Sequence, residues 1–179
     1  MKAKEKILQG AVRLFSAKGY SESSTDEIIL NSGISKGLLF YHYKNKDGLL
    51  NAILEHAWKI IQETSDINTT EKTAERALRA IIKQMTTSLI KDYDYWKVYM
   101  AVLLNIELSK KLNINLYNPS EVYYNLTIDL FRKMGKKSPE RWAFSFDIHL
   151  RGISFGYISD PKSFPLEQAK QVMIDMFTR

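Results

Sequence analysis

The chain contains 179 residues, with 26 Lys and Arg against 20 Asp and Glu, a formal net charge of +6, and no cysteine. This length suits a single domain or a small module joined to a larger one. The lack of cysteine excludes a disulfide framework, a zinc site with thiolate ligands and a cysteine nucleophile. Apolar residues make up 45 % of the chain, so we expect a folded core and not global disorder.

Positive charge is concentrated in the first quarter of the chain, where residues 1–48 hold eight basic and five acidic side chains. A basic end suits a nucleic acid or an anionic surface, although a solvated surface with a small charge bias explains it at least as well. The sequence begins with charged residues, unlike a signal peptide, and no apolar run approaches the roughly 20 residues of a membrane-spanning helix. We therefore expect a cytoplasmic protein without a membrane partner.

Apolar residues recur at helical spacing in three short N-terminal segments, which predicts helices at about 3–17, 25–31 and 36–42. Gly19 lies where the first helix should end, and the Ser-Thr-Asp-Glu sequence at 24–27 is a capping box for the second. A short helix, a turn that contains glycine and a second short helix are the plan of a DNA-binding helix-turn-helix.

The third predicted helix has two faces. Leu39, Phe40 and Tyr43 should be buried against the first two helices. Facing outward we expect Lys36, Gly37, Tyr41 and His42. Gly37 lies inside this helix, where glycine costs about 1 kcal/mol relative to alanine. A close approach to DNA would explain that cost, whereas taken singly these residues could also be ordinary surface and core positions.

The rest of the chain predicts about six further helices, which makes the fold all-α. A long helix follows Asn45 and ends before a polar linker at 65–70, and residues 113–119 predict a loop. The other helices are expected at 71–91, 93–111, 120–133, 139–157 and 166–177.

Several short motifs follow one another in register between residues 5 and 52. They are Ile7-Leu8, Leu14-Phe15, Gly19-Tyr20, Thr25, Ile28, Ser32 to Gly37, Tyr41 to Lys46, and Leu49-Leu50. This pattern resembles the N-terminal domain of TetR-family transcriptional regulators. The resemblance implies a DNA-binding helix-turn-helix domain at 1–46, and an effector-binding and dimerisation domain of helices at 47–179.

The resemblance also implies which residues contact DNA, by matching position: Thr25, Lys36, Gly37, Tyr41, His42 and Lys46. Lys36 and Gly37 are the best candidates for base edges, because a lysine can donate to guanine O6 and N7. The other four are expected to contact phosphates. Ile29 and Ser32 stand where the family usually has alanine, so the packing of the second helix is expected to be adjusted.

Regulators of this type bind near-palindromic double-stranded DNA as twofold dimers, because one module makes few contacts. The last two predicted helices are the candidate interface, since they carry small residues, which permit a close helix–helix approach, together with apolar residues. The residues proposed for this homodimer contact are Gly152, Gly156, Val172, Met173 and Met176. Packing within one chain is the alternative explanation for them.

Aromatic residues are frequent in the middle of the chain and could line a pocket for a small hydrophobic or aromatic effector. The candidate lining consists of Trp58, Trp96, Tyr99, Leu103, Tyr123, Tyr124, Phe146 and His149. For any one of these, an ordinary core position is the more common explanation, which for His149 means a core histidine with a hydrogen-bond partner.

Enzyme motifs are absent: the sequence has no Walker A loop, G-x-G-x-x-G, G-x-S-x-G or H-E-x-x-H. Its three histidines lack metal-ligand spacing, so we expect no catalysis, no cofactor and no metal. The sequence therefore predicts a ligand-responsive transcriptional regulator, most simply a repressor. The alternative is a helical ligand-binding protein that has lost specific DNA binding.

Overall fold

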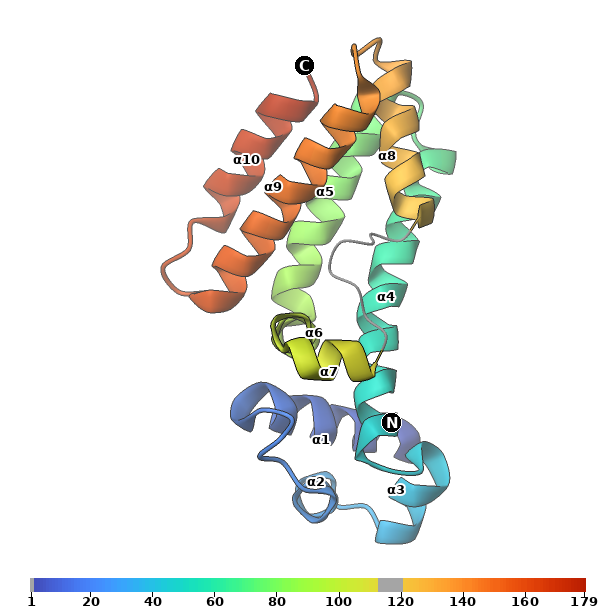
Figure 1. Cartoon of the computed structure of the whole chain (residues 1–179), viewed down its shortest axis with the longest axis vertical. Helices are drawn as coiled ribbons and strands as arrows, with labels where there is room; N and C mark the ends of the chain where they lie inside the picture. Colours follow the sequence, from blue (N-terminus) through green and yellow to red (C-terminus); the bar gives the residue numbers. More distant parts are fainter. Residues whose placement is uncertain (1, 113–120) are drawn as a thin grey trace. The chain divides into compact units, whose positions relative to one another are not determined.

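The computed structural model describes residues 2–112 and 121–179, with the backbone alone for 64–70 and 121–122, and all the regular structure in this part is helical (Figure 1). The all-α prediction is confirmed. The helices are α1 (Ala3–Lys18), α2 (Thr25–Ser32), α3 (Lys36–Tyr43), α4 (Lys46–Thr70), α5 (Ala74–Lys91), α6 (Tyr93–Leu104), α7 (Ile106–Lys111), α8 (Glu121–Lys133), α9 (Pro139–Ser159) and α10 (Leu166–Phe177).

Two expected boundaries were wrong. Helix α4 continues to Thr70, so the polar run at 65–70 is helical and not a linker. The single helix expected at 93–111 is divided at Asn105, whose side-chain oxygen accepts a hydrogen bond from the Leu108 amide at 3.0 Å and so caps a new helix. The loop expected at 113–119 lies outside the described residues.

The chain divides into two compact units. The first unit contains Met1–Trp58 and Asp94–Asn115, and the second contains Lys59–Tyr93 and Leu116–Arg179. Helix α4 belongs to both, with the division after Trp58, whereas the expected domain boundary lies after residue 46, where α4 begins. The functions assigned to the two domains remain predictions.

The core of the first unit forms where α1 packs against α2 and α3 (Figure 1). Ile7, Ala11 and Phe15 recur on one face of α1 and are buried, as are Ile28 of α2 and Leu39 of α3. Burying one large apolar side chain contributes about 1.5–3 kcal/mol. Three helices of 16, 8 and 8 residues are thus held together mainly by one apolar stripe from each.

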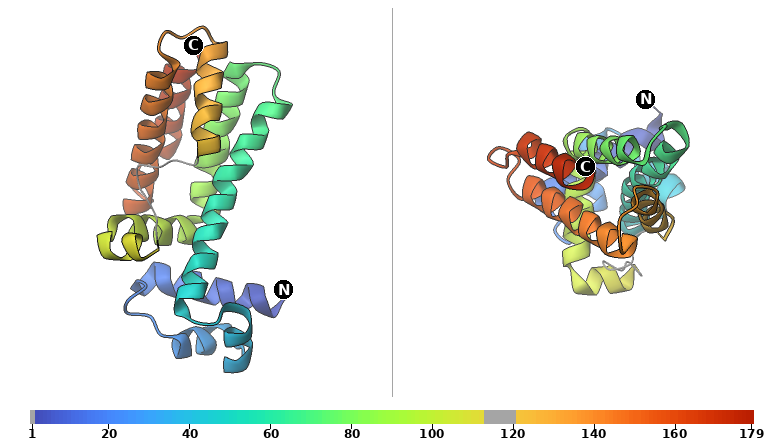
Figure 2. Two further views of the ribbon diagram at one scale, coloured as in Figure 1. Left: turned by 45° about the vertical axis from the view of Figure 1, so that its right-hand side comes forward. Right: turned by 90° about the horizontal axis from the view of Figure 1, so that it is seen from above.

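The second unit is a bundle in which α5, α8, α9 and α10 run side by side (Figure 2). At its centre Phe131, Phe146 and Phe177 are fully buried, with ring centroids 5.2–6.1 Å apart. Tilted and edge-on ring pairs of this kind add about 0.5–1.5 kcal/mol each beyond the area they bury. Within the described residues no helix combines the length and the apolar character that crossing a membrane requires.

Candidate nucleic-acid interface

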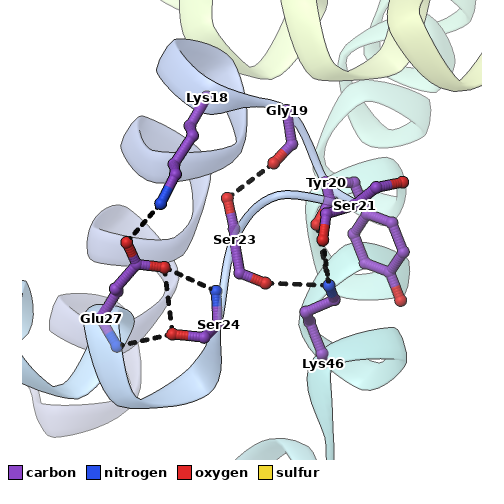
Figure 3. A network of polar contacts seen from close by, with 8 residues as sticks. All are labelled: Lys18, Gly19, Tyr20, Ser21, Ser23, Ser24, Glu27 and Lys46. Atoms are coloured by element: carbon purple, nitrogen blue, oxygen red, sulfur yellow. Dashed lines mark hydrogen bonds and ion pairs between the residues drawn. The ribbon is translucent and has the colours of Figure 1, made fainter.

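The start of α2 is fixed by the capping box that the sequence predicted (Figure 3). The Ser24 hydroxyl accepts a hydrogen bond from the Glu27 amide at 3.2 Å, and the Glu27 carboxylate accepts one from the Ser24 amide at 2.9 Å. The ammonium of Lys18, at the end of α1, lies 2.5 Å from the other carboxylate oxygen. The hydrogen bonds from Lys18 and Ser24 lower the pKa of Glu27 to about 2. The first turn of α2 is therefore held to α1.

The turn between α2 and α3 has the expected geometry. Gly33 has a φ of 65°, in the left-handed region, and its amide donates to the Ile29 carbonyl at 3.0 Å. The Ser35 hydroxyl accepts from the Leu38 amide at 3.4 Å and caps α3. These two residues set the direction in which α3 leaves the turn.

Helix α3 buries a narrower face than the sequence predicted. Leu39 and Tyr43 are buried, and the Tyr43 hydroxyl donates to the Lys4 carbonyl of α1 at 2.9 Å. Burial raises the pKa of Tyr43 to about 12. The expectation for Phe40 was wrong, since its side chain is 40 % exposed. Residues four apart lie on one helix face, so Leu39 and Tyr43 are buried together, and Phe40 lies at the margin of that face.

The outward face of α3 carries the predicted contact residues. Tyr41 is 81 % exposed, Lys36 and Gly37 are exposed, and His42 is half-exposed. The Lys36 ammonium lies 3.1 Å from an Asp26 carboxylate oxygen, in a pair of highly exposed side chains. Such a pair contributes about 0–1 kcal/mol, so Lys36 can exchange it for another acceptor.

Packing gives no reason for glycine at position 37. A Cβ atom built on Gly37 would meet nothing within 4 Å. Glycine therefore costs helix stability at this position without relieving a contact inside the chain.

The two remaining predicted contact residues begin helices. Thr25 is the first residue of α2 and is half-exposed, which leaves it at the capped end of that helix. Lys46 is the first residue of α4 and is also half-buried, but its ammonium lies 2.8 Å from the Tyr20 carbonyl and 2.9 Å from the Ser23 carbonyl. Lys46 thus has protein partners that the sequence pattern did not indicate.

One close helix contact was missed in the sequence. A Cβ atom on Gly10 of α1 would lie 3.1 Å from the Ser32 Cβ of α2, so Gly10 provides the room that Ser32 needs. Ile29, the other unusual residue of α2, is half-exposed. The sequence feature that could have revealed this contact is a glycine in the middle of an amphipathic helix.

The eight candidate pocket residues are divided between the two units. In the first unit Trp96, Tyr99 and Leu103 are buried and Trp58 is half-buried. The Tyr99 ring centroid lies 5.7 Å from that of Trp96 and 6.3 Å from that of Trp58, with both pairs edge-on. These rings pack against one another as core residues do.

In the second unit Tyr123 and Phe146 are buried, and the half-exposed Tyr124 donates from its hydroxyl to the Glu140 carbonyl at 3.4 Å. Burial raises the pKa of Tyr123. The Nδ1 atom of half-exposed His149 lies 2.7 Å from the Ser145 carbonyl. His149 also lines a groove of about 320 Å³ between α9 and α10.

The candidate dimer residues differ in how much of their surface is exposed. Gly152 faces open space, and Val172 and Met176 are exposed. Met173, by contrast, is only 1 % exposed, because it packs inside its own unit, and so offers no surface to a second copy. A Cβ on Gly156 would lie 2.3 Å from the Phe164 ring, which explains this glycine within one chain.

Exposed aromatic and aliphatic side chains that the sequence analysis did not single out lie on the same face of α9 as Gly152. They are Phe144, Ile148 and Phe155. The spacing 144, 148, 152 and 155 is a helical stripe, and this pattern could have revealed them. The exposed face of α9 is therefore more apolar than predicted.

Residues 7–53 match the family model described as "Bacterial regulatory proteins, tetR family". Residues 7–53 of this chain are therefore similar to the DNA-binding region of tetR-family regulators. The matched residues include α2, α3 and the turn between them, so the tetR-family match coincides with the helix-turn-helix described above.

Curated relatives differ in how much of this chain they match. The transcriptional regulator QacR of Staphylococcus aureus is 44 % identical over 62 residues, which are 33 % of this chain and 33 % of QacR. The uncharacterised regulator YerO of Bacillus subtilis is 26 % identical over 164 residues, which are 87 % of this chain and 55 % of YerO. The biofilm operon negative regulator IcaR of Staphylococcus epidermidis is 38 % identical over 55 residues, 31 % of this chain and 30 % of IcaR. The chain thus spans about half or less of these relatives.

Solved structures share the fold along almost the whole chain. A TerR/AcrR-family regulator of Aquifex aeolicus superimposes with a TM-score of 0.78 at 22 % identity, covering 98 % of this chain and 97 % of that one. The complex of SmeT with triclosan gives a TM-score of 0.74 at 20 % identity, covering 99 % and 90 %. SmeT alone is described as the repressor of a multidrug efflux pump of Stenotrophomonas maltophilia.

Proposed function

We propose that this chain is a sequence-specific DNA-binding transcriptional regulator that represses its target and is released by a small-molecule effector. The observation that carries the proposal is the outward face of α3, where Lys36, Gly37 and Tyr41 are exposed while Leu39 and Tyr43 anchor the opposite face. The tetR-family match over the same helices supports the assignment.

The chemistry of this face suits the major groove of DNA. The Lys36 ammonium donates to guanine O6 and N7, and the absence of a side chain on Gly37 lets the backbone come close to a base edge. The hydroxyls of Thr25 and Tyr41 and a ring N–H of His42 donate to phosphates, which fixes the position of α3 without reading sequence. The few polar groups on a helix of eight residues leave room for a contribution from DNA shape.

Two copies of the chain are needed to present two such helices to one operator. We place the dimer contact on the exposed apolar face of α9 and α10, with Gly152, Val172 and Met176 together with Phe144 and Phe155. A twofold dimer pairs with a near-palindromic operator, whose half-sites lie about one helical turn or a multiple apart.

The names of two similar proteins support repression and release by an effector. IcaR is a negative regulator by name, and SmeT was solved in complex with triclosan. An apolar or aromatic effector fits the aromatic content of the helices after α3, and its binding would favour a dimer state with a different spacing of the two α3 helices. The chain would act in the cytoplasm, on DNA, by binding and not by catalysis.

Selection of duplexes from a random pool tests the proposal. The full chain is expected to enrich a near-palindromic sequence, and the affinity for it should fall steeply as salt is raised. If no sequence is enriched, the proposal fails and the chain is better explained as a helical ligand-binding protein. The enriched duplex then becomes the probe with which effectors are screened for release.

A further inference from the structure

The ammonium of Lys46 lies in a cradle of main-chain carbonyl oxygens from the turn that joins α1 to α2 (Figure 3). Its Nζ atom is 2.8 Å from the Tyr20 oxygen, 3.4 Å from the Ser21 oxygen and 2.9 Å from the Ser23 oxygen. The same atom lies 4.3 Å from the centroid of the Tyr20 ring. A lysine ammonium has three N–H donors, and here each has a carbonyl acceptor.

The next residue of α4 holds the same turn through a side chain. The Tyr20 hydroxyl donates to one carboxylate oxygen of Asp47, and the Lys111 ammonium of α7 lies 2.9 Å from the other. The Tyr20 and Lys111 contacts lower the pKa of Asp47, whereas burial, and after it Asp47, raises the pKa of Tyr20. Lys46 and Asp47 thus bind the turn with opposite charges.

The turn between α1 and α2 also determines where α2 begins. Ser23 is buried, and its hydroxyl donates to the Gly19 carbonyl at 2.6 Å while its own carbonyl accepts from Lys46. The following residue, Ser24, is the N-cap of α2, and Thr25 is the first residue of the helix. A shift of the Ser23 carbonyl therefore moves the first turn of α2.

We infer that Lys46 is a positioning residue, which acts on DNA binding by holding the turn at 20–23 and with it the start of α2, and is not a phosphate ligand. The inference rests on the proposed DNA-binding function. It replaces the role that the family resemblance implied for Lys46, because a phosphate would have to compete with three carbonyls that the ammonium already contacts.

Amine acetylation of the wild-type chain tests this directly. The free protein and its complex with the selected duplex are treated briefly with an acetylating reagent, and each lysine is followed by peptide mass spectrometry. Lys46 should react several times more slowly than exposed Lys44 without DNA, and the duplex should change it little. Lys36 should become slow only when the duplex is present. The inference is overturned if Lys46 reacts as fast as Lys44 in the free protein and slows on adding DNA.

Variants separate positioning from phosphate binding by different readouts. Lys46→Met should weaken binding to the selected duplex by about tenfold or more without changing the salt dependence, whereas loss of a phosphate contact lowers the log–log slope by about 0.9 per site. Lys46→Arg should not restore binding, because an ammonium carries three donors on one nitrogen, whereas a planar guanidinium spreads its donors over three nitrogens. Lys59→Met removes the same charge from an exposed position of the same helix and should change affinity by less than about twofold.

Each remaining result has a definite meaning. If Lys46→Arg binds like wild type, or if Lys46→Met is folded and binds unchanged, the positioning role is contradicted. If Lys46→Met does not fold, acetylation of the wild type still decides between cradle and phosphate. If no lysine slows on any duplex, the proposed function fails, and the role of Lys46 in DNA binding fails with it, even where its amine is protected in the free protein.

Discussion

Both units have an apolar core, but they differ in the contacts that accompany it. In the first unit the helix ends are joined by directed polar contacts, such as Lys18 with Glu27, Lys46 with the turn carbonyls, and Tyr20 with Asp47. In the second unit the helices meet through apolar rings, with Phe146 and Phe177 at the centre. Polar contacts require particular atoms at particular distances, whereas apolar packing requires mainly volume and shape.

This difference explains why the similarity to other proteins is unevenly distributed. QacR is 44 % identical over 62 residues, and the tetR-family model matches residues 7–53. Along the whole chain the Aquifex aeolicus regulator keeps the fold, with a TM-score of 0.78, at only 22 % identity. A bundle tolerates apolar exchanges of similar volume, while a helix-turn-helix with fixed caps and an outward binding face tolerates fewer.

The largest effect is expected from removing a ring of the second unit. Phe146→Ala should lower the free energy of unfolding by about 3–5 kcal/mol, because a fully buried ring leaves a cavity. Urea denaturation followed by circular dichroism measures this change. Ile90→Ala, at an exposed position of α5, is the control and should cost less than about 1 kcal/mol. Equal losses in both variants would contradict the assignment of the core.

A smaller loss is expected where α3 joins α4. A Cβ on Gly48 would lie 1.9 Å from the Tyr43 carbonyl oxygen, a contact that only backbone movement can relieve. Gly48→Ala should cost about 1–3 kcal/mol of stability and also weaken DNA binding, because α3 would shift. Thermal denaturation and titration of the selected duplex test both effects. A variant as stable as wild type would show that the junction is not tight.

Gly37→Ala is expected to change stability in the opposite direction to Gly48→Ala. With nothing near the added methyl, the variant should gain about 0.5–1 kcal/mol of stability from helix propensity. Its affinity for the selected duplex should nevertheless fall, because the methyl would separate the backbone from a base edge. A gain in stability with unchanged affinity would remove Gly37 from the interface.

Acid should loosen the α1–α2 contact in a defined pH range. The pKa of Glu27 is lowered to about 2 in the folded chain, from an ordinary value of 4.5. Its stabilising contribution is therefore complete above about pH 4.5 and is lost as the pH falls toward 2. The melting temperatures of wild type and Glu27→Gln should converge over this range. A constant difference between them would contradict the role of the ionised carboxylate.

The smallest effect concerns the acidic neighbour of the binding face. Asp26→Asn should strengthen binding to the selected duplex by about two- to fivefold, because it frees the Lys36 ammonium and removes a negative charge near phosphate. Fluorescence anisotropy at two salt concentrations measures the change, and Glu22→Gln, which removes an exposed charge from the turn before α2, shows the effect of net charge alone. Equal gains in both variants would leave no specific role for Asp26.

Local features were predictable from the sequence, and long-range ones were not. The capping box at Ser24 and Glu27 and the turn at Gly33 involve residues one to four apart, so their geometry follows from the pattern itself. The carbonyl partners of Lys46 are 23–26 residues away, and only the folded chain brings them together. The sequence therefore predicted only a phosphate contact for Lys46, at the start of its helix.

The other differences between the sequence-based predictions and the structure have the same origin. Gly156 was interpreted as a dimer residue because its partner, Phe164, returns across a turn that the periodicity does not describe. The run at 65–70 was expected to be a linker because its composition is polar, although α4 continues through it. Propensity and spacing thus predict elements, while partners between elements require the fold.

A second round of duplex selection tests the central claim most directly, with Lys36→Ala and Tyr41→Ala carried in parallel with wild type. If the outward face of α3 reads DNA, Lys36→Ala should return the wild-type sequence with one guanine position relaxed. Tyr41→Ala should return the unchanged sequence, bound several times more weakly. Two variants that select the wild-type sequence with undiminished affinity would show that this face of α3 does not bind DNA.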